Sequence, residues 1–192
     1  MVFEEYKSLL SQRLSAYRFN HSLCVAESAL ALAEKYGADR EKAFVAGLLH
    51  DITKEARTDE HFALFEQGGV RLTELERINH KLWHAMSGAV YIKTKLNITD
   101  EEIITAVRYH TTARAGMSLL EKIIYVADFI SADRDYNDVE TVRELAEKSL
   151  EETMLYTQSF SISHLIKKGA CIHPDSVASY NELMLSKFSL EG

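Results

Sequence analysis

Apolar residues recur along this chain mainly at intervals of three and four positions, which is the spacing of one face of an α-helix. The first such series consists of Phe3, Tyr6, Leu9, Leu10 and Leu14. Two of the series end at glycine, at Gly37 and at Gly68-Gly69, and glycine commonly terminates helices. No segment alternates convincingly between apolar and polar residues as a half-buried strand does. We therefore predict an all-α fold.

The same pattern sets the bounds of the expected helices. We expect helices over 3–14, about 18–36, Asp39 to His50-Asp51, 58–68, 82–96, 99–109, 118–130, about 138–168 with a break near 159–163, and from Pro174 onward. Residues 99–102 read Thr-Asp-Glu-Glu, which has the Ser/Thr-x-x-Glu form of a capping box. The segment 118–130 is apolar on nearly every side, which indicates a central helix.

Composition is ordinary for a globular protein, with 46% apolar and 27% charged residues, and a chain of 192 residues can bury a sizeable core. No apolar run is long enough to span a membrane, and the N-terminal residues lack the order of a signal peptide. Only Cys24 and Cys171 are present, too few for a disulfide framework, and a reducing compartment suits them. We expect a cytoplasmic protein.

The formal net charge of -7 bears on possible partners. Long-range electrostatics will not attract DNA or an anionic membrane to such a chain. If the substrate is a polyphosphate, a metal ion and a few basic residues must attract it locally. We expect a small-molecule substrate, no DNA partner and no membrane. A homodimer through the apolar segment 160–166 is a further expectation, although this segment can equally belong to the core.

A histidine followed by an aspartate stands at the end of an apolar helix. Residues 43–49 read Ala-Phe-Val-Ala-Gly-Leu-Leu and run directly into His50-Asp51. Adjacent residues do not share a helix face, but where a helix ends the backbone can turn both side chains toward one point. The dipeptide alone is a weak signal. In an apolar setting, however, it favours a metal site.

Asp128 repeats this combination of an ionisable side chain and apolar surroundings, because it lies inside the apolar segment 119–130. Burying an unpaired carboxylate is costly in free energy. A cation or a strong hydrogen-bond donor is therefore expected beside Asp128. A salt bridge to Arg134 or Arg18 would satisfy this requirement as well as a metal ion would.

Three further histidines complete a set of candidate ligands on five helices or helix ends: His21, His50, Asp51, His84, His110 and Asp128. A helical bundle can direct such residues at one interior point. Imidazole nitrogens and carboxylate oxygens without thiolates suit iron, manganese, zinc, cobalt or nickel. The sequence therefore predicts an interior metal site.

Each histidine also has an ordinary interpretation. His21 can be an ordinary helix histidine that binds no metal, and His84 can be one of a pair of surface histidines. His110 can interact with the C-terminal end of its helix, where the helix dipole favours a cation. His61 and His164 lie among polar residues, and we expect them to be solvated.

The ordered ligand set resembles the HD superfamily of metal-dependent phosphohydrolases. More narrowly, the chain is similar to one bacterial family, the symmetrical bis(5'-nucleosyl)-tetraphosphatases, which cleave diadenosine tetraphosphate into two ADP. The similarity extends from Tyr17 to about Asn181. The matching strings are 18–22 (Arg-Phe-Asn-His-Ser), 47–54 (Gly-Leu-Leu-His-Asp-Ile-Thr-Lys), 108–112 (Arg-Tyr-His-Thr-Thr), 116–119 (Gly-Met-Ser-Leu), 127–128 (Ala-Asp) and Asn181.

The resemblance implies a single HD domain over 1–192, a compact bundle with an interior metal site. Its core would span about 17–135, and helices over about 138–190 would complete the bundle and a nucleotide pocket. The primary metal, which family members carry as iron, would be held by His21, His50, Asp51 and Asp128. A metal-activated water would cleave the substrate, and the catalytic residues would be Asp51, His84 and His110.

The resemblance leaves the number of ions open. His84 and His110 would either bind a second metal or contact the phosphates. With two ions, Asp51 would be the natural bridging carboxylate. We expect divalent iron first, in one or two ions, with manganese, zinc, cobalt or nickel as alternatives.

Basic residues near the ligands are candidates for substrate binding. Lys54 lies one turn past the His-Asp pair, and Arg18 lies one turn before His21. Arg134 follows the apolar helix, and a guanidinium can bind phosphate oxygens in a bidentate way. Each has an ordinary alternative, such as a solvated Lys54 or an Arg134 paired with a nearby acid.

His173 is a candidate for contact with the base or ribose, because glycine and proline shape the loop over 168–174. The loop can equally be a plain connection between helices. For the whole chain, two alternatives to the tetraphosphatase remain. One is another HD-type nucleotide phosphohydrolase that acts on nucleoside 5'-monophosphates or deoxynucleotides. The other is a nucleotide-binding module with a structural metal.

Overall fold

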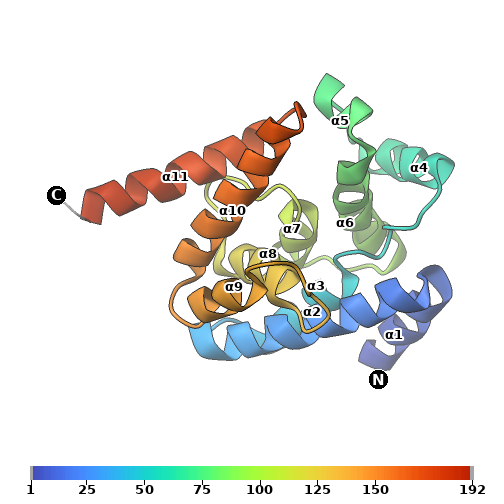
Figure 1. Cartoon of the computed structure of the whole chain (residues 1–192). Helices are drawn as coiled ribbons and strands as arrows, with labels where there is room; N and C mark the ends of the chain where they lie inside the picture. The colour runs from blue at the N-terminus through green and yellow to red at the C-terminus, as the bar shows by residue number, and fades with distance from the viewer. Residues whose placement is uncertain (1, 191–192) are drawn as a thin grey trace.

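The computed structural model of the chain describes residues 2–190, and this part is built from helices without strands (Figure 1). The prediction of an all-α fold is confirmed. The elements are α1 (Val2–Arg13), α2 (Ala16–Tyr36), α3 (Arg40–Leu49), α4 (Thr58–Gly68), α5 (Glu74–Ile78), the 3-10 helix η1 (His80–Leu82), α6 (Trp83–Lys95), α7 (Glu101–Tyr109), α8 (Leu119–Ile130), α9 (Val139–Ala146), α10 (Leu150–Lys167) and α11 (Pro174–Leu190).

Local hydrogen bonds fix several helix ends where the sequence predicts them. Asp39 caps α3, because its side chain accepts from the backbone amides of Glu41 and Lys42. Gly37 ends α2 in the left-handed conformation, with φ at 76°. The backbone can adopt this conformation there at low cost because glycine has no Cβ.

The start of α7 differs from the expectation. Asp100, not Thr99, is the N-cap, and its side chain accepts from the amide of Glu102. Lys42 pairs with the Asp100 carboxylate at 2.9 Å, which holds that side chain at the helix start. The capping box predicted at Thr99 is therefore wrong. A capping box does form at the start of α5, between Thr73 and Glu76.

The long helical stretch after residue 138 is interrupted earlier than expected. The break lies between α9 and α10, where Ser149 caps α10 by accepting from the amide of Glu152. In the segment 159–163, Ser159 donates instead to the carbonyl of Leu155 at 2.7 Å, a bond compatible with a continuous helix. The predicted break near 159–163 is wrong.

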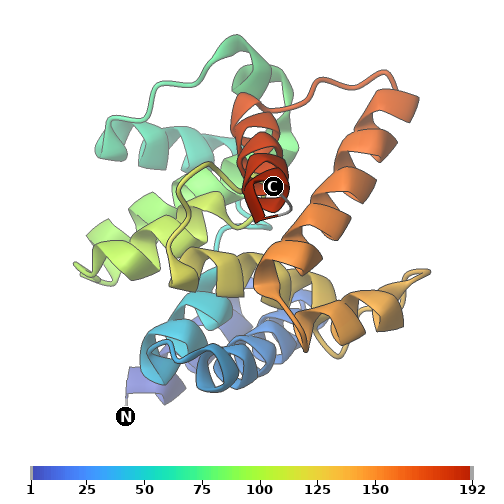
Figure 2. The same ribbon diagram turned by 90° about the vertical axis from the view of Figure 1, so that its left-hand side faces the viewer.

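Helix α8 lies at the centre, as its apolar surface predicts, and packs against α2, α3, α7, α9 and α10. Ile123, Ile124 and Val126 on this helix have no exposed surface. Figure 2 shows α8 between the N-terminal helices and the long α10. One face of α8 therefore lies against α2, which carries His21, and against α3, which His50 and Asp51 directly follow.

Helices α2 and α3 approach each other closely at Gly47. A Cβ atom built on Gly47 would lie 2.9 Å from Ala26 Cα, closer than carbon atoms can pack. The absence of a side chain at Gly47 lets the two helices meet at this point. As a result, His21 on α2 and His50 after α3 come together, with ring centroids 5.2 Å apart.

The C-terminal helices reach beyond this core. Helix α11 projects from the body, and Leu185 and Phe188 on its outer turns are exposed (Figure 1). On α10, Phe160 and Ile166 are also exposed. Within residues 2–190, none of the helices combines the length and apolarity needed to cross a lipid bilayer.

Candidate metal centre

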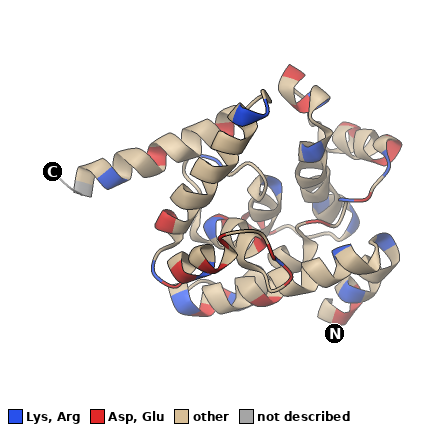
Figure 3. Cartoon of the chain, viewed as in Figure 1, with Lys and Arg blue, Asp and Glu red and all other residues tan. Residues whose placement is uncertain are grey.

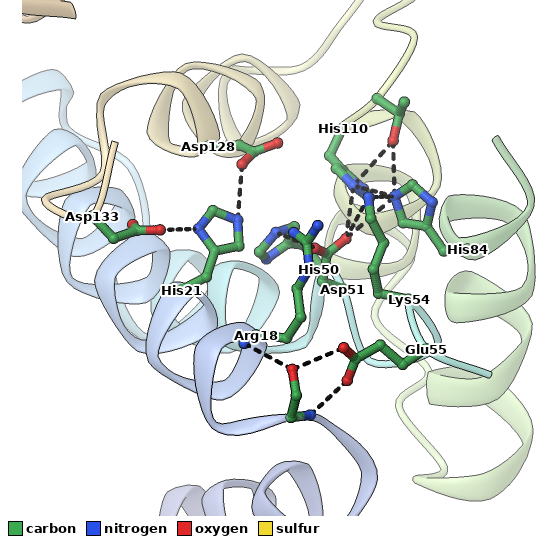
Figure 4. A network of polar contacts seen from close by, with 12 residues as sticks. Arg18, His21, His50, Asp51, Lys54, Glu55, His84, His110, Asp128 and Asp133 are labelled. Atoms are coloured by element: carbon green, nitrogen blue, oxygen red, sulfur yellow. Dashed lines mark hydrogen bonds and ion pairs between the residues drawn. The ribbon is translucent and has the colours of Figure 1, made fainter. Parts of the chain in front are cut away.

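The six predicted ligands meet in the interior, as Figure 4 shows. His21 lies on α2, His84 on α6 and Asp128 on α8, while His50-Asp51 and His110 directly follow α3 and α7. The four histidines and Asp51 are at most 3% exposed. Residues separated by more than 100 positions along the chain therefore form one buried cluster.

His50 and His110 are held by the same local bond. The Nδ1 of His50 lies 2.7 Å from the carbonyl oxygen of Gly47, and the Nδ1 of His110 lies 2.8 Å from that of Val107. Each imidazole thus donates to a carbonyl at the end of its own helix, which would otherwise lack a partner. This bond selects the tautomer whose Nε2 carries a free lone pair toward the cluster.

The Nε2 of His50 has no hydrogen-bond partner within residues 2–190 and is fully buried. Burial lowers the pKa of His50 to about 4, so the ring is neutral at physiological pH. A neutral imidazole with an unpaired nitrogen, surrounded by carboxylates and other imidazoles, is the arrangement of a metal ligand. The donor atoms present here fit a divalent cation.

His21 is bracketed by two carboxylates. Its Nε2 lies 3.1 Å from Asp128 Oδ1, and its Nδ1 lies 2.8 Å from Asp133 Oδ2 (Figure 4). Burial acts to lower the pKa of His21, but the hydrogen bond to Asp128 and the two negative charges outweigh it and raise the pKa. The sequence did not single out Asp133, which has no motif of its own. Its role follows from its position in the loop after α8.

Asp51 presents its two oxygens to different partners. Oδ2 lies 3.6 Å from His50 Nε2, whereas Oδ1 lies 3.2 Å from His84 Nε2 and 3.7 Å from His110 Nε2. Burial alone would raise the pKa of Asp51, but the neighbouring His50 and the positive charge of Lys54 hold it well below its usual range. The carboxylate is therefore ionised and lies between two groups of histidines.

One ring nitrogen of His84 has three polar atoms close to it. Its Nε2 lies 3.1 Å from His110 Nε2, 3.2 Å from Thr111 Oγ1 and 3.0 Å from Lys54 Nζ. Burial, and next the charge of Lys54, lower the pKa of His84 well below its usual range. Because His110 also presents a lone pair, two nitrogen acceptors face each other beside the Asp51 carboxylate. A cation bound between these acceptors would remove the repulsion between their lone pairs.

Ligand atoms within 4.8 Å of one another form three sets of three residues: His21, His50 and Asp51; His50, His110 and Asp128; Asp51, His84 and His110. The first and third sets share Asp51 and are otherwise separate. The cluster therefore has room for two neighbouring ions as well as for one.

Asp128 is less buried than the sequence predicts. Its side chain is about a fifth exposed (21%), so the carboxylate lies at the edge of the apolar interior. Arg134 meets it, donating through Nε to the Asp128 carbonyl at 2.7 Å and pairing with its carboxylate. Partial burial would raise the pKa of Asp128, but the hydrogen bond from His21 and the charge of Arg134 hold it well below its usual range.

Two other basic candidates border the cluster. Lys54 Nζ lies 3.3 Å from Asp51 Oδ1, and Arg18 lies 3.4 Å from Asp51 Oδ2. Their side chains keep 29% and 28% of their surface exposed, so each joins the buried centre to solvent. Lys54 is therefore not the freely solvated lysine of its ordinary interpretation. Arg134 forms its ion pair with Asp128 and not with Asp133 or Asp135, the acids next to it in the sequence.

A cavity of about 200 Å³ adjoins the centre. Thr111 lines it and lies 3.0 Å from His110 Nε2, so the cavity and the centre share this residue. His173 lines it from the loop before α11, with its Nε2 3.4 Å from Glu76 on α5. Tyr125, Ile162 and Leu165 provide apolar walls.

His61 is not solvated, and that expectation is wrong. It is 7% exposed, lies beside Phe65 and Trp83, and its Nδ1 is 2.8 Å from Ser87 Oγ. Ser87 in turn lies 2.8 Å from Thr53 Oγ1. The aromatic residues of α4 and α6 cover His61, which its polar sequence neighbours did not indicate. His164 is exposed, as expected.

Comparison with known proteins agrees with this geometry. The family model described as "HD domain" matches residues 18–133. A symmetrical bis(5'-nucleosyl)-tetraphosphatase of Bacillus subtilis is 36% identical over 94% of this chain and 97% of its own length. One of Halalkalibacterium halodurans is 37% identical over 93% and 95%. The chain belongs to the HD-domain family of the symmetrical bis(5'-nucleosyl)-tetraphosphatases.

A solved structure supports the same assignment to the HD family. A predicted HD superfamily hydrolase involved in NAD metabolism, from Clostridium acetobutylicum, is 33% identical. It superposes with a TM-score of 0.93 over 96% of this chain and 97% of its own. HD domains bind divalent metals, and the buried cluster of this family member has the residues to do so.

Proposed function

We propose that this chain is a metal-dependent hydrolase that cleaves diadenosine tetraphosphate symmetrically into two ADP. The observation that supports it is the buried His/Asp cluster beside a cavity, in a chain similar over nearly its full length to named symmetrical tetraphosphatases. In this reaction, water adds across the central P–O–P bond. One ADP takes up the hydroxyl, and the other departs with the bridging oxygen and a proton.

In this proposal His21, His50, Asp51 and Asp128 would hold the first ion, and Asp51, His84 and His110 would hold a second ion if one binds. Because the two Asp51 oxygens face different histidines, Asp51 would be the residue shared by both ligand sets. A divalent metal, for which we propose iron with manganese as a substitute, supplies Lewis-acid chemistry that lowers the pKa of water and balances phosphate charge.

The protein's own residues prepare this site before substrate arrives. The bonds from His50 and His110 to their helix carbonyls orient both rings so that each Nε2 is directed toward the cluster. Asp133 orients the His21 ring similarly, because its carboxylate accepts a hydrogen bond from His21 Nδ1. Pre-oriented ligands need little rearrangement on binding, which favours both affinity and rate.

The basic residues at the rim are proposed to hold the tetraphosphate. Lys54 and Arg18 reach Asp51 from the exposed side, so each can exchange this contact for a phosphate oxygen. Arg134 is bound to Asp128 and is proposed to contact phosphate with its remaining donors. Thr111 connects His84 and His110 to the cavity, and these two histidines would contact the cleaved phosphates if only one ion is present.

One nucleoside is proposed to occupy the cavity that Thr111 and His173 line. His173 is 11% exposed in its side chain, and its contact with Glu76 keeps the ring at the cavity wall. It is therefore placed for contact with a ribose or base.

Product analysis tests the proposal. Protein purified without oxygen is incubated with diadenosine tetraphosphate and ferrous or manganous ion, and the products are separated by ion-exchange chromatography. ADP as sole product is expected. AMP with ATP, or turnover only of nucleoside 5'-monophosphates, would contradict symmetrical cleavage. Binding without turnover would indicate a nucleotide-binding module.

A variant connects the activity to the cluster. Asp51→Asn should lower turnover by more than about 100-fold, because even residues that merely support metal ligands cost about 10- to 100-fold. Its bound metal, measured by mass spectrometry of the elements, should fall in parallel. Asp59→Asn is the matched control, since Asp59 is exposed and its carboxylate pairs with the exposed Arg57.

The remaining expectations about partners stay predictions. Lys and Arg are interspersed with Asp and Glu along the helices in Figure 3, which agrees with a protein that does not bind DNA. The exposed Phe160 and Ile166 on α10 keep the homodimer a reasonable prediction. Size-exclusion chromatography with light scattering tests it. A cytoplasmic location likewise stays a prediction.

A further inference from the structure

Thr111 lies where the metal centre meets the cavity, in the loop over 110–118 that joins α7 to α8. Its Oγ1 lies 3.0 Å from His110 Nε2 and 3.2 Å from His84 Nε2, so one hydroxyl contacts both nitrogens. The groups of a metal or catalytic site must be held to within about 0.5 Å of their working positions. The contacts that fix residues 111 and 112 therefore affect the geometry of the centre.

Two side chains of α11 hold this loop. Ser176 Oγ donates to the carbonyl of Thr112 at 2.7 Å. The Glu182 carboxylate accepts from the amide of Gly116, with N–O distances of 2.8 and 3.1 Å. These bonds join residues 64 and 66 positions apart in the sequence. Because both bonds end on backbone atoms of the loop, they fix the path of the loop and not only the rotamer of one side chain.

The two ends of the loop are held by other contacts. His110 is fixed by its own bond to the carbonyl of Val107, and Arg114 pairs with Glu121 on α8, with Nε 2.6 Å from the carboxylate. Thr112 lies between these two points and is 6% exposed. A buried carbonyl that loses its donor is costly in free energy. The middle of the loop therefore depends on α11.

We propose that Ser176 and Glu182 are positioning residues, which hold the loop so that the Thr111 hydroxyl stays against His84 and His110. The inference rests on the proposed function only for the use of these two histidines at the centre. Ser176 should have the larger effect, because it serves a buried carbonyl. Glu182 is exposed, so water can replace much of its contact with the loop.

Nuclear magnetic resonance of the histidine rings tests the proposal on the whole metal-free protein, because ring nitrogen signals report the hydrogen bonding of each Nε2. Thr111→Val removes the hydroxyl and should shift the signals of His84 and His110, which gives the reference pattern. Ser176→Ala should shift the same two rings in the same direction and leave His21 on α2 unchanged.

Two further variants of α11 separate the contact with the loop from a general effect on the helix. Ser186→Ala is the matched control, because it removes a hydroxyl that donates within α11 to the carbonyl of Glu182. It should change none of the ring signals. Glu182→Gln keeps an acceptor for the Gly116 amide and should resemble the wild type, whereas Glu182→Ala should show a smaller version of the Ser176→Ala pattern.

Metal affinity measures the consequence for the centre. Ser176→Ala should weaken the binding of manganous ion, measured by competition with a chelator, about two- to tenfold, which corresponds to roughly one net hydrogen bond. If Ser176 acts through Thr111, the double variant Ser176→Ala/Thr111→Val should bind the ion no more weakly than Thr111→Val alone. Additive losses in the double variant would overturn the proposal.

Unchanged signals of His84 and His110 in folded Ser176→Ala would also overturn it. Equal shifts of these rings and of His21 would do the same, since they would indicate a general loosening of the fold. If Ser176→Ala does not fold, the comparison of Glu182→Ala with Glu182→Gln decides, and equal signals in these two variants would contradict the proposal. Because these measurements need no turnover, an absence of hydrolysis contradicts the proposed function and leaves them to decide on α11.

Discussion

The rings of His50 and His110 meet edge to face with their centroids 5.0 Å apart, and each donates from Nδ1 to the carbonyl three residues earlier. Both residues directly follow the last residue of a helix, His50 after α3 and His110 after α7. The same local geometry, used twice, directs two Nε2 atoms to one buried point. No long-range contact is needed to set either tautomer.

His21 depends instead on a distant carboxylate, and this difference leads to a first prediction. Asp133→Asn should weaken the binding of manganous ion and lower kcat/KM by about tenfold, because Asp133 orients His21 through its Nδ1. Metal affinity is measured by competition with a chelator. Asp135→Asn, two residues on and exposed, should leave both quantities unchanged. Equal effects of the two variants would exclude an orienting role for Asp133.

The hydroxyl of Ser87 supports a buried polar chain near His84. It lies 2.8 Å from both His61 Nδ1 and Thr53 Oγ1. Ser87→Ala should lower the free energy of unfolding by about 1–3 kcal/mol, since it removes the hydrogen bond of the buried His61 Nδ1. Urea unfolding measures the change. Ser11→Ala, an exposed site, should change it by less than about 0.5 kcal/mol.

His61 should make stability depend on pH. Burial lowers the pKa of His61 in the folded chain, so the unfolded chain binds a proton there more readily. Its contribution is complete above the unfolded pKa of about 6.5 and is lost as pH falls toward the lowered folded pKa. His61→Asn has no such titration. The difference in unfolding free energy between wild type and His61→Asn should therefore shrink from pH 7.5 to pH 5, and a constant difference would contradict it.

Gly47 should tolerate no side chain. In Gly47→Ala the new Cβ would lie 2.9 Å from Ala26 Cα, so α2 and α3 must separate. We expect a loss of about 1–3 kcal/mol in unfolding free energy, together with weaker metal binding as His50 moves from His21. Thermal unfolding and metal titration measure the two effects.

Gly88→Ala is the matched control for this variant. Its Cβ would meet Thr53 and Val107 at 3.4 Å, an ordinary van der Waals distance. Alanine also has the higher helix propensity, so this variant should be at least as stable as the wild type. Equal losses in both variants would refute the argument from the close approach of α2 and α3.

Much of the fold could be predicted from local patterns. Asp39 and Gly37 act through hydrogen bonds and backbone angles within a few residues, so the ends of their helices are encoded next to them. The apolar surface of 118–130 likewise indicated its central position. Where two local signals compete, as at Thr99 and Asp100, the contact of Asp100 with the distant Lys42 decided the outcome.

By itself, the sequence determined the all-α fold, helix ends such as those at Gly37 and Asp39, and the six candidate ligands, because periodicity, caps and ligand chemistry are properties of neighbouring residues. Tertiary structure alone decided that Asp133 meets His21 from 112 positions away. It also decided that aromatic residues of other segments cover His61. These facts depend on how helices pack, since burial and long-range partners arise only when separate segments are brought together.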